Sequence, residues 1–150
     1  MIFVRLQSEP FDAGAMLAQM DALGGGGVAS FTGIVRGDGG LQELFLEHHP
    51  AMTAQMMDAL AQDAVTRWSL LGVALIHRHG ALLPGEPIVF VATTAKHRAA
   101  ALEACASLID RLKTQAPFWK RETFADGRVN WVEAKAEDDA AAARWLRDAR

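Results

Sequence analysis

The sequence predicts one α+β domain with a mostly antiparallel sheet and about four helices. The chain has 150 residues, which fits the roughly 100–200 residues of one domain. Hydrophobic residues make up 51% and charged residues 22%, so the chain can bury a core and differs from a disordered protein. Helix-like segments alternate with pairs of strand-like segments joined by turn residues. Such hairpins give antiparallel pairing.

The chain begins with a predicted strand and a predicted helix. Ile2–Leu6 is a short apolar strand. Asp12 can cap a helix that runs to about Leu23, because its carboxylate can accept from free amides of the first turn. The four glycines Gly24–Gly27 then indicate a loop.

A hairpin and a long helix are predicted next. Val28–Arg36 is rich in β-branched residues and predicts a strand. After the flexible turn Gly37–Gly40, Leu41–Glu47 alternates roughly in polarity, and we expect it to pair with the preceding strand as a hairpin. Apolar residues at helical spacing then predict a helix over Thr53–Trp68, led in by Pro50.

Two further strands and a third helix follow. Gly72–His79 and Ile88–Thr94 predict strands separated by the turn Leu83–Pro87. A helix is expected from about His97 to Thr114, ended by Pro117. The residues that we expect this helix to bury are Leu102, Cys105, Ile109 and Leu112.

The last segments predict a hairpin and a fourth helix. Phe118–Phe124 and Arg128–Val132 flank Asp126-Gly127, a strong hairpin signal. The amphipathic segment Asp138–Arg147 has acidic residues at its start and arginines at its end, as the helix dipole favours.

Charge and motifs narrow the function classes. The net charge of −3 disfavours non-specific nucleic-acid binding. No apolar run reaches the ~18 residues of a membrane span, and the first residues lack the pattern of a secretion signal, so we expect a cytoplasmic protein. The sequence contains neither a GxGxxG segment after a strand nor a phosphate-loop motif. Nucleotide chemistry is therefore unsupported.

Two lysines around a proline are the leading catalytic candidates. Lys113 lies at the edge of the apolar face of the third predicted helix, and Lys120 follows seven residues later, beyond Pro117. A helix end and a strand start joined by so short a turn can direct both ammonium groups into one cleft, where they would attract an anion. From the pattern alone, a lysine like Lys113 is more often a cation favoured by the helix C-terminus, and one like Lys120 is more often a solvated strand residue.

Other candidates divide between anion binding and structure. His97 and Arg98 open the third predicted helix, where free amides and the dipole favour a phosphate or carboxylate, although a charged cap is equally compatible. Arg36 ends a strand before a glycine-rich loop.

His77 and His79 share a strand face, but no third cluster of ligands accompanies them, and we expect no metal site. Cys105 fits a buried, unreactive position, so the chain is not expected to carry sulfur itself.

Several segments, in this order and spacing, resemble one family. The most specific is LKTQAPFWKRE at Leu112–Glu122. From about Val28 to Trp145 the sequence resembles the large, catalytic subunit of molybdopterin synthase. The other segments that carry the resemblance are Phe31–Arg36, Leu46–Met52, Ile76–Gly80, Pro84–Glu86, His97–Arg98 and Trp131–Ala134.

The resemblance implies an α/β hammerhead fold and a central homodimer. It also implies a small ubiquitin-like sulfur-carrier subunit at each end, which makes a heterotetramer. The C-terminal Gly-Gly of the carrier ends in a thiocarboxylate, and its tail enters a pocket on this subunit. Two sulfurs are transferred to cyclic pyranopterin monophosphate, whose cyclic phosphate opens to give the dithiolene molybdopterin. Other proteins insert molybdenum later, so the resemblance implies neither a resident metal nor a cofactor.

The same resemblance assigns roles to individual residues. Lys113 and Lys120 match the two catalytic lysines of the family. Lys135 stands where some relatives have an arginine contributed across the dimer, which replaces a two-pronged donor with a point charge. The positions that match the substrate pocket are Arg36, His97, Arg98, Arg121 and Glu122.

Two rival functions stay open at this stage. The chain could be a non-catalytic relative that only binds the carrier or an anion, although the lysine pair argues against this. It could also be another acyl or sulfur transferase that uses the same carrier with a different acceptor. Supplying thiocarboxylated carrier and measuring dithiolene product separates the first rival from the predicted enzyme, and a panel of acceptors separates the second.

Overall fold

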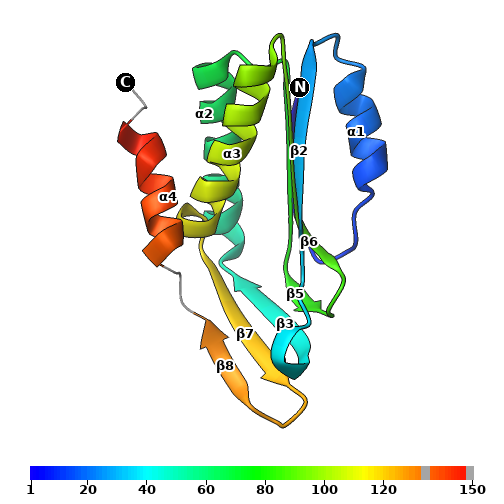
Figure 1. Ribbon diagram of the computed structural model, residues 1–150, viewed down its shortest axis with the longest axis vertical. Helices are drawn as coiled ribbons and strands as arrows, with labels where there is room; N and C mark the ends of the chain where they lie inside the picture. Colours follow the sequence, from blue (N-terminus) through cyan, green and yellow to red (C-terminus); the bar gives the residue numbers. More distant parts are fainter. Residues whose placement is uncertain (133–135, 148–150) are drawn as a thin grey trace.

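The computed structural model describes residues 1–132 and 136–147, in which eight strands form two four-stranded sheets (Figure 1). The first sheet contains β1 (Ile2–Gln7), β4 (Gly72–Arg78), β6 (Pro87–Ala95) and β2 (Gly27–Ile34), in that order. The second contains β5 (Gly80–Leu82), β3 (Leu41–His48), β7 (Phe118–Phe124) and β8 (Val129–Val132), in that order. β1 runs parallel to β4, and the other pairs in the described part are antiparallel. The predicted α+β class is confirmed.

Four α-helices cover the sheets unequally. In Figure 1, one helix lies on one side of the first sheet and the other three lie on the opposite side, above the second sheet. The side chain of Asp12 accepts from the Ala15 amide, as the sequence predicts for a capping residue. The described α-helices are α1 (Ala13–Asp21), α2 (Pro50–Trp68), α3 (Arg98–Gln115) and α4 (Ala136–Arg147), and a short 3-10 turn spans Asp38–Gly40.

Strand β4 connects the two halves of the core. It is buried on both faces, because successive side chains of a strand point to opposite sides. Val73 and Leu75 belong to the cluster formed with α2 and α3, whereas Ala74 and Ile76 pack against α1. A strand buried on both sides shows a continuous apolar run, as β4 does, and fixes the helices on its two faces relative to each other.

The predicted hairpin between the second and third strands is wrong. β2 pairs with β6 in the first sheet, whereas β3 pairs with β5 and β7 in the second. Backbone hydrogen bonds tie Val35 to the turn before β6: its amide donates to the Glu86 carbonyl, and its carbonyl accepts from the Gly85 amide. The chain therefore leaves the first sheet after β2 and enters the second as β3.

Three smaller predictions also need correction. The short strand β5 was not predicted, and it pairs with β3 through only three residues. Helix α2 begins at Pro50, because His49 caps it by accepting from the Met52 amide at Nδ1. Leu102 is 59% exposed rather than buried. The buried face of α3 instead runs through smaller residues such as Ala101 and Ala104.

The glycine-rich segment predicted as a loop also shapes the start of α3. Gly27 already belongs to β2, while Gly24 has a left-handed φ of +79°. The Gly26 amide donates to the Ala95 carbonyl, and a β-carbon at Gly26 would lie only 2.1 Å from the Lys96 carbonyl oxygen. Only glycine allows the two backbones to approach this closely.

The hairpin predicted around Asp126-Gly127 is confirmed. β7 and β8 pair across it, Gly127 has a φ of +89°, and the Asp126 carboxylate accepts from the Arg128 amide.

None of the described helices is both long and apolar enough to cross a membrane.

Candidate functional site

A cleft of about 470 Å³ opens where the two sheets meet the C-terminal end of α3. Its polar side chains include those of Arg36, Lys113 and Lys120. Apolar residues of β2, β6 and α3 form most of the remaining wall. The other lining residues are Phe31, Thr32, Gly33, Ile34, His77, Ile88, Val89, Ile109 and Leu112.

The two predicted lysines therefore share one cleft. Lys113 is in the last turn of α3, and Lys120 is the third residue of β7. Both residues are exposed at the cleft surface. None of the described residues that line this cleft is a carboxylate, so its charged groups are all cationic. Such a site favours an anionic ligand.

The bend between the lysines is held from α2. The hydroxyl of Thr53, which is completely buried, donates to the Pro117 carbonyl at 2.8 Å. The same hydroxyl accepts from the His49 amide at 3.1 Å. Pro117 ends α3 because it cannot continue the helix, and Thr53 fixes the direction in which the chain then enters β7.

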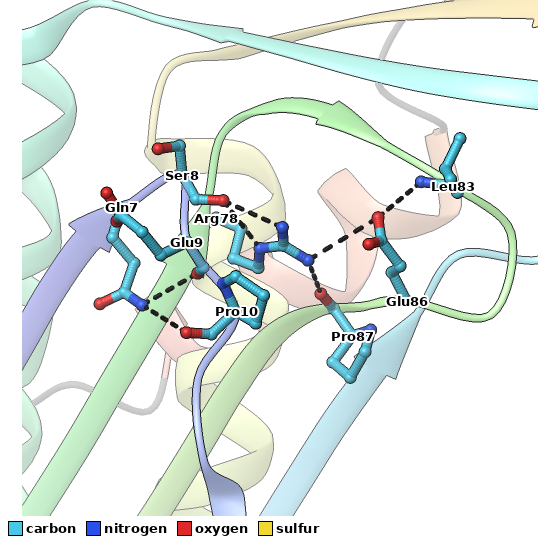
Figure 2. Close-up of polar contacts among 8 residues, drawn as sticks. All are labelled: Gln7, Ser8, Glu9, Pro10, Arg78, Leu83, Glu86 and Pro87. Atoms are coloured by element: carbon cyan, nitrogen blue, oxygen red, sulfur yellow. Dashed lines mark hydrogen bonds and ion pairs between the residues drawn. The ribbon is translucent and has the colours of Figure 1, made fainter.

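Arg36 lines the cleft, and the turn beside it, between β5 and β6, is held by a buried arginine. Figure 2 shows this residue, Arg78, with its polar contacts. The Arg78 guanidinium donates to the Ser8 carbonyl from both Nε and Nη2, and to the Pro87 carbonyl from Nη1. Its Nη1 also lies 3.9 Å from the Glu86 carboxylate, which accepts from the Leu83 amide. Because this turn is hydrogen-bonded to Val35, the residue before Arg36, it determines where the chain places Arg36 after the end of β2.

Arg36 itself is paired only at the surface. Its Nε lies 3.5 Å from the Asp38 carboxylate, and both side chains are 79% exposed. An ion pair this exposed contributes little to stability, so the guanidinium can exchange Asp38 for an anionic ligand at small cost.

Two predicted substrate residues lie at the opposite end of α3. His97 occupies the N-cap position without a capping hydrogen bond from its side chain, and Arg98 is the first residue of the helix. Lys113 lies fifteen residues after Arg98. At 1.5 Å per helical residue, this separation is about 22 Å. Neither residue lines the cleft. A single chain therefore does not bring His97 and Arg98 to the cleft that contains Lys113, and their role in substrate binding stays a prediction.

Arg121 and Glu122 follow Lys120 but do not line the cleft either. Arg121 points to the other face of β7, as expected for adjacent residues in a strand. Its guanidinium lies over the rings of Phe45, at 4.8 Å from the centroid, and Trp131, at 5.9 Å. Lys135 lies outside the described residues.

From the sequence, the spacing of His77 and His79 on one strand face pointed only to possible metal ligands. In the structure His77 lines the cleft and stacks on Phe118, with ring centroids 3.9 Å apart, whereas His79 stacks on His48. Among the described residues, no group of three or more His, Cys, Asp or Glu side chains could hold a metal ion. Burial lowers the pKa of His77 to about 4, so its ring is neutral near pH 7.

Cys105 is buried, as predicted, with 7% of its surface exposed. Burial raises the pKa of its thiol to about 11, so the thiolate form is scarce near pH 7. The residue belongs to α3 but does not line the cleft. The chain's only cysteine is therefore poorly suited to nucleophilic chemistry at this site.

Comparisons with known proteins agree on one family. The family described as "MoaE protein" matches residues 6–115. The "Molybdopterin synthase catalytic subunit" of Cereibacter sphaeroides is 47% identical over 145 residues, covering 95% of this chain and 99% of the relative. The protein of the same name from Pseudomonas aeruginosa is 46% identical over 147 residues, covering 95% and 97%.

A solved structure extends this agreement to the fold. It is named "Molybdopterin biosynthesis MoaE protein from Burkholderia ambifaria MC40-6". It aligns with a TM-score of 0.82 at 43% identity and covers 97% of this chain and 99% of that protein.

Proposed function

The chain belongs to the MoaE family, and from this premise we propose that its cleft performs the sulfur transfer of molybdopterin synthase. The acceptor is cyclic pyranopterin monophosphate, and the donor is the C-terminal thiocarboxylate of a small carrier subunit. The product is the dithiolene molybdopterin, so the enzyme acts in molybdenum cofactor biosynthesis. The observation that carries the proposal is the meeting of Arg36, Lys113 and Lys120 in one cleft.

The charges of the cleft suit this reaction. A cyclic phosphate and a thiocarboxylate are both anions, and bringing them together requires cations at the place where they meet. Lys113 contacts the thiocarboxylate and stabilises charge that develops at the reacting centre, and Lys120 assists from the facing strand. Arg36 binds the phosphate, for which a planar guanidinium is well shaped.

The sulfur must come from outside this chain. Cys105 is buried, its raised pKa keeps the thiol protonated near pH 7, and it does not line the cleft. The names of the relatives, which specify a catalytic subunit, support a second subunit in the enzyme. A carrier tail can supply sulfur without any nucleophile from the chain itself.

His97 and Arg98 can join the cleft if a second copy supplies them. β2 is at the edge of the first sheet, and Phe31 and Ile34 on this strand are 42% and 54% exposed. One end of β2 lies beside Arg98, since a β-carbon on Gly27 would be 3.5 Å from the Arg98 Cα. The other end leads to Arg36. Antiparallel pairing of two β2 edges about a two-fold axis would therefore bring His97 and Arg98 of each copy to the cleft of the other.

A reconstituted reaction tests the activity. The purified chain is combined with thiocarboxylated carrier and cyclic pyranopterin monophosphate, and the dithiolene product is measured by mass spectrometry. Lys113→Ala should lower product formation by about 100-fold or more, in line with the loss of one preorganised charge-stabilising group. Carrier binding and the circular dichroism spectrum should be unchanged. Near-normal turnover of this variant would reject the assignment.

A mixing experiment tests the composite site. Lys113→Ala chains and His97→Ala/Arg98→Ala chains, each nearly inactive alone, are unfolded and refolded together. If each cleft uses both copies, mixed dimers contain one intact cleft. Random pairing then restores about a quarter of wild-type activity, because half of the dimers are mixed and each has one working site of two. No recovery would show that His97 and Arg98 act within their own chain, and a double variant that is active alone would show that they are not needed.

A further inference from the structure

His77 is a cleft residue that the proposed reaction has not yet used. It is the sixth residue of β4, and its ring packs nearly parallel to that of Phe118, with an angle of 20° between the planes. Phe118 and Lys120 lie on the same face of β7, two residues apart. The imidazole is therefore held in one orientation on the cleft wall beside Lys120.

The backbone fixes the tautomer of this ring. Nδ1 of His77 lies 2.7 Å from the Arg78 carbonyl oxygen. A carbonyl can only accept a hydrogen bond, so Nδ1 carries the proton, and in the neutral ring Nε2 has the lone pair. The low pKa of this imidazole keeps that lone pair available near pH 7.

Nε2 is the ring nitrogen that this backbone contact does not use. Among the described residues, none makes a hydrogen bond to Nε2. The fully buried side-chain atoms without a partner are Ser107 Oγ and Arg111 Nε, and Nε2 is not one of them. Because His77 lines the cleft and Nδ1 is engaged by the backbone, Nε2 is the polar atom that its ring offers to a ligand.

The cleft otherwise offers few side-chain acceptors. Arg36, Lys113 and Lys120 can only donate hydrogen bonds, and among the other described side chains that line the cleft only the Thr32 hydroxyl can accept one. Such donors hold the anionic parts of a ligand but cannot recognise its N–H or O–H groups. The neutral His77 ring has this complementary capacity.

We propose that His77 is a substrate-binding residue, whose Nε2 accepts a hydrogen bond from an N–H or O–H group of the pyranopterin and so orients the ring system in the cleft. This proposal rests on the proposed function, because it takes the pterin as the ligand. A flat heterocycle rich in N–H groups also suits the apolar walls provided by Phe31, Ile88 and Leu112. The carrier tail instead brings an anionic terminus, which the cations bind.

Three variants test the proposal in the complete enzyme with its carrier. His77→Phe keeps an aromatic ring against Phe118 but removes the acceptor, and His77→Gln restores a side-chain acceptor near the position of Nε2. His79→Phe is the matched control, because His79 lies two residues further on and does not line the cleft. KM is measured separately for cyclic pyranopterin monophosphate and for thiocarboxylated carrier, and pterin binding is measured by calorimetry without carrier.

We expect His77→Phe to raise the KM and the dissociation constant for the pterin about three- to tenfold, the usual effect of one lost neutral hydrogen bond. The KM for carrier should not change. His77→Gln should recover part of the loss, and His79→Phe should match the wild type. Circular dichroism checks the fold of each variant. If His77→Phe does not fold, His77→Asn, whose shorter side chain does not reach the position of Nε2, takes its place. Equal pterin KM values for His77→Gln and His77→Asn would then overturn the proposal.

The remaining outcomes separate the two proposals. An inactive wild-type enzyme would overturn the proposed function. An active wild type with unchanged pterin binding in His77→Phe would overturn only the role of His77. A changed carrier KM with unchanged pterin KM would also overturn it, because the acceptor would then serve the carrier tail.

Discussion

The Thr53 hydroxyl donates a hydrogen bond to the Pro117 carbonyl at 2.8 Å, and this contact joins α2 to the bend between the two cleft lysines. The two residues are 64 positions apart in the chain. The contact shows how a helix that contributes no residue to the cleft lining still determines the direction of β7 and therefore the position of Lys120.

Replacing Thr53 by Val should therefore affect both stability and activity. Valine has nearly the same shape but leaves the His49 amide and the Pro117 carbonyl without this partner. We expect a loss of about 1–3 kcal/mol in the free energy of unfolding, measured by urea denaturation, and a lower kcat. Thr53→Ser keeps the hydroxyl and is the control. Equal kcat values in the Val and Ser variants would show that the contact does not position the bend.

Replacing Arg78 by Lys should destabilise the turn that leads to Arg36. Arg78 is 5% exposed and donates three hydrogen bonds to backbone carbonyls, a geometry that an ammonium group cannot reproduce. We expect a loss of about 1–3 kcal/mol in unfolding free energy. The exposed Arg5 offers a matched control, since Arg5→Lys should change stability by less than about 0.5 kcal/mol. Similar values for both variants would contradict the structural role of Arg78.

The stability of the protein should depend on His77 in acid. Its pKa is about 4 in the folded protein and 6.5 in an unfolded chain, so the unfolded state binds more protons between these values. Stability is therefore retained above pH 6.5 and is lost as the pH falls toward 4, by up to about 3 kcal/mol. The pKa of His79 is also lowered, mainly by burial and then by the nearby His48. Its titration therefore adds to the loss of stability in acid.

Thermal melts of wild type and His77→Gln across this range measure the effect. The variant lacks the titrating ring, so the difference in stability between the two proteins should shift in its favour as the pH falls. Both proteins contain the same carboxylates, so the contribution of these groups to the pH dependence cancels in the difference. A difference that stays constant from pH 7 to pH 4 would contradict the neutral state of the half-buried His77 ring.

Replacing Gly26 by Ala should destabilise the region where β2 meets the start of α3. The new β-carbon would lie 2.1 Å from the Lys96 carbonyl oxygen, so the backbone must shift. We expect a cost of about 1–3 kcal/mol, as for other overpacked sites. Gly14→Ala is the control, because its β-carbon meets only the Asp12 carboxylate at 3.4 Å and α1 should gain about 0.5–1 kcal/mol. Chemical denaturation gives both values.

Local patterns in the sequence were enough to predict most of the secondary structure. Periodicity and turn residues located all four described α-helices, the hairpin at Asp126-Gly127 and the buried position of Cys105. They missed β5, whose three residues are too few to show a period, and they placed Leu102 in the core. That last error arose because small residues on α3, not its larger ones, face the sheet.

The sequence by itself determined the family and the two lysines around Pro117, because their chemistry and spacing lie within one short segment. Only the tertiary structure decided which other side chains meet them. It separated β3 from β2, brought Arg36 and His77 into the cleft, and placed His97 and Arg98 at the far end of α3. These relationships depend on long-range strand pairing and on the length of a rigid helix, and neither can be obtained from the residues next to each position.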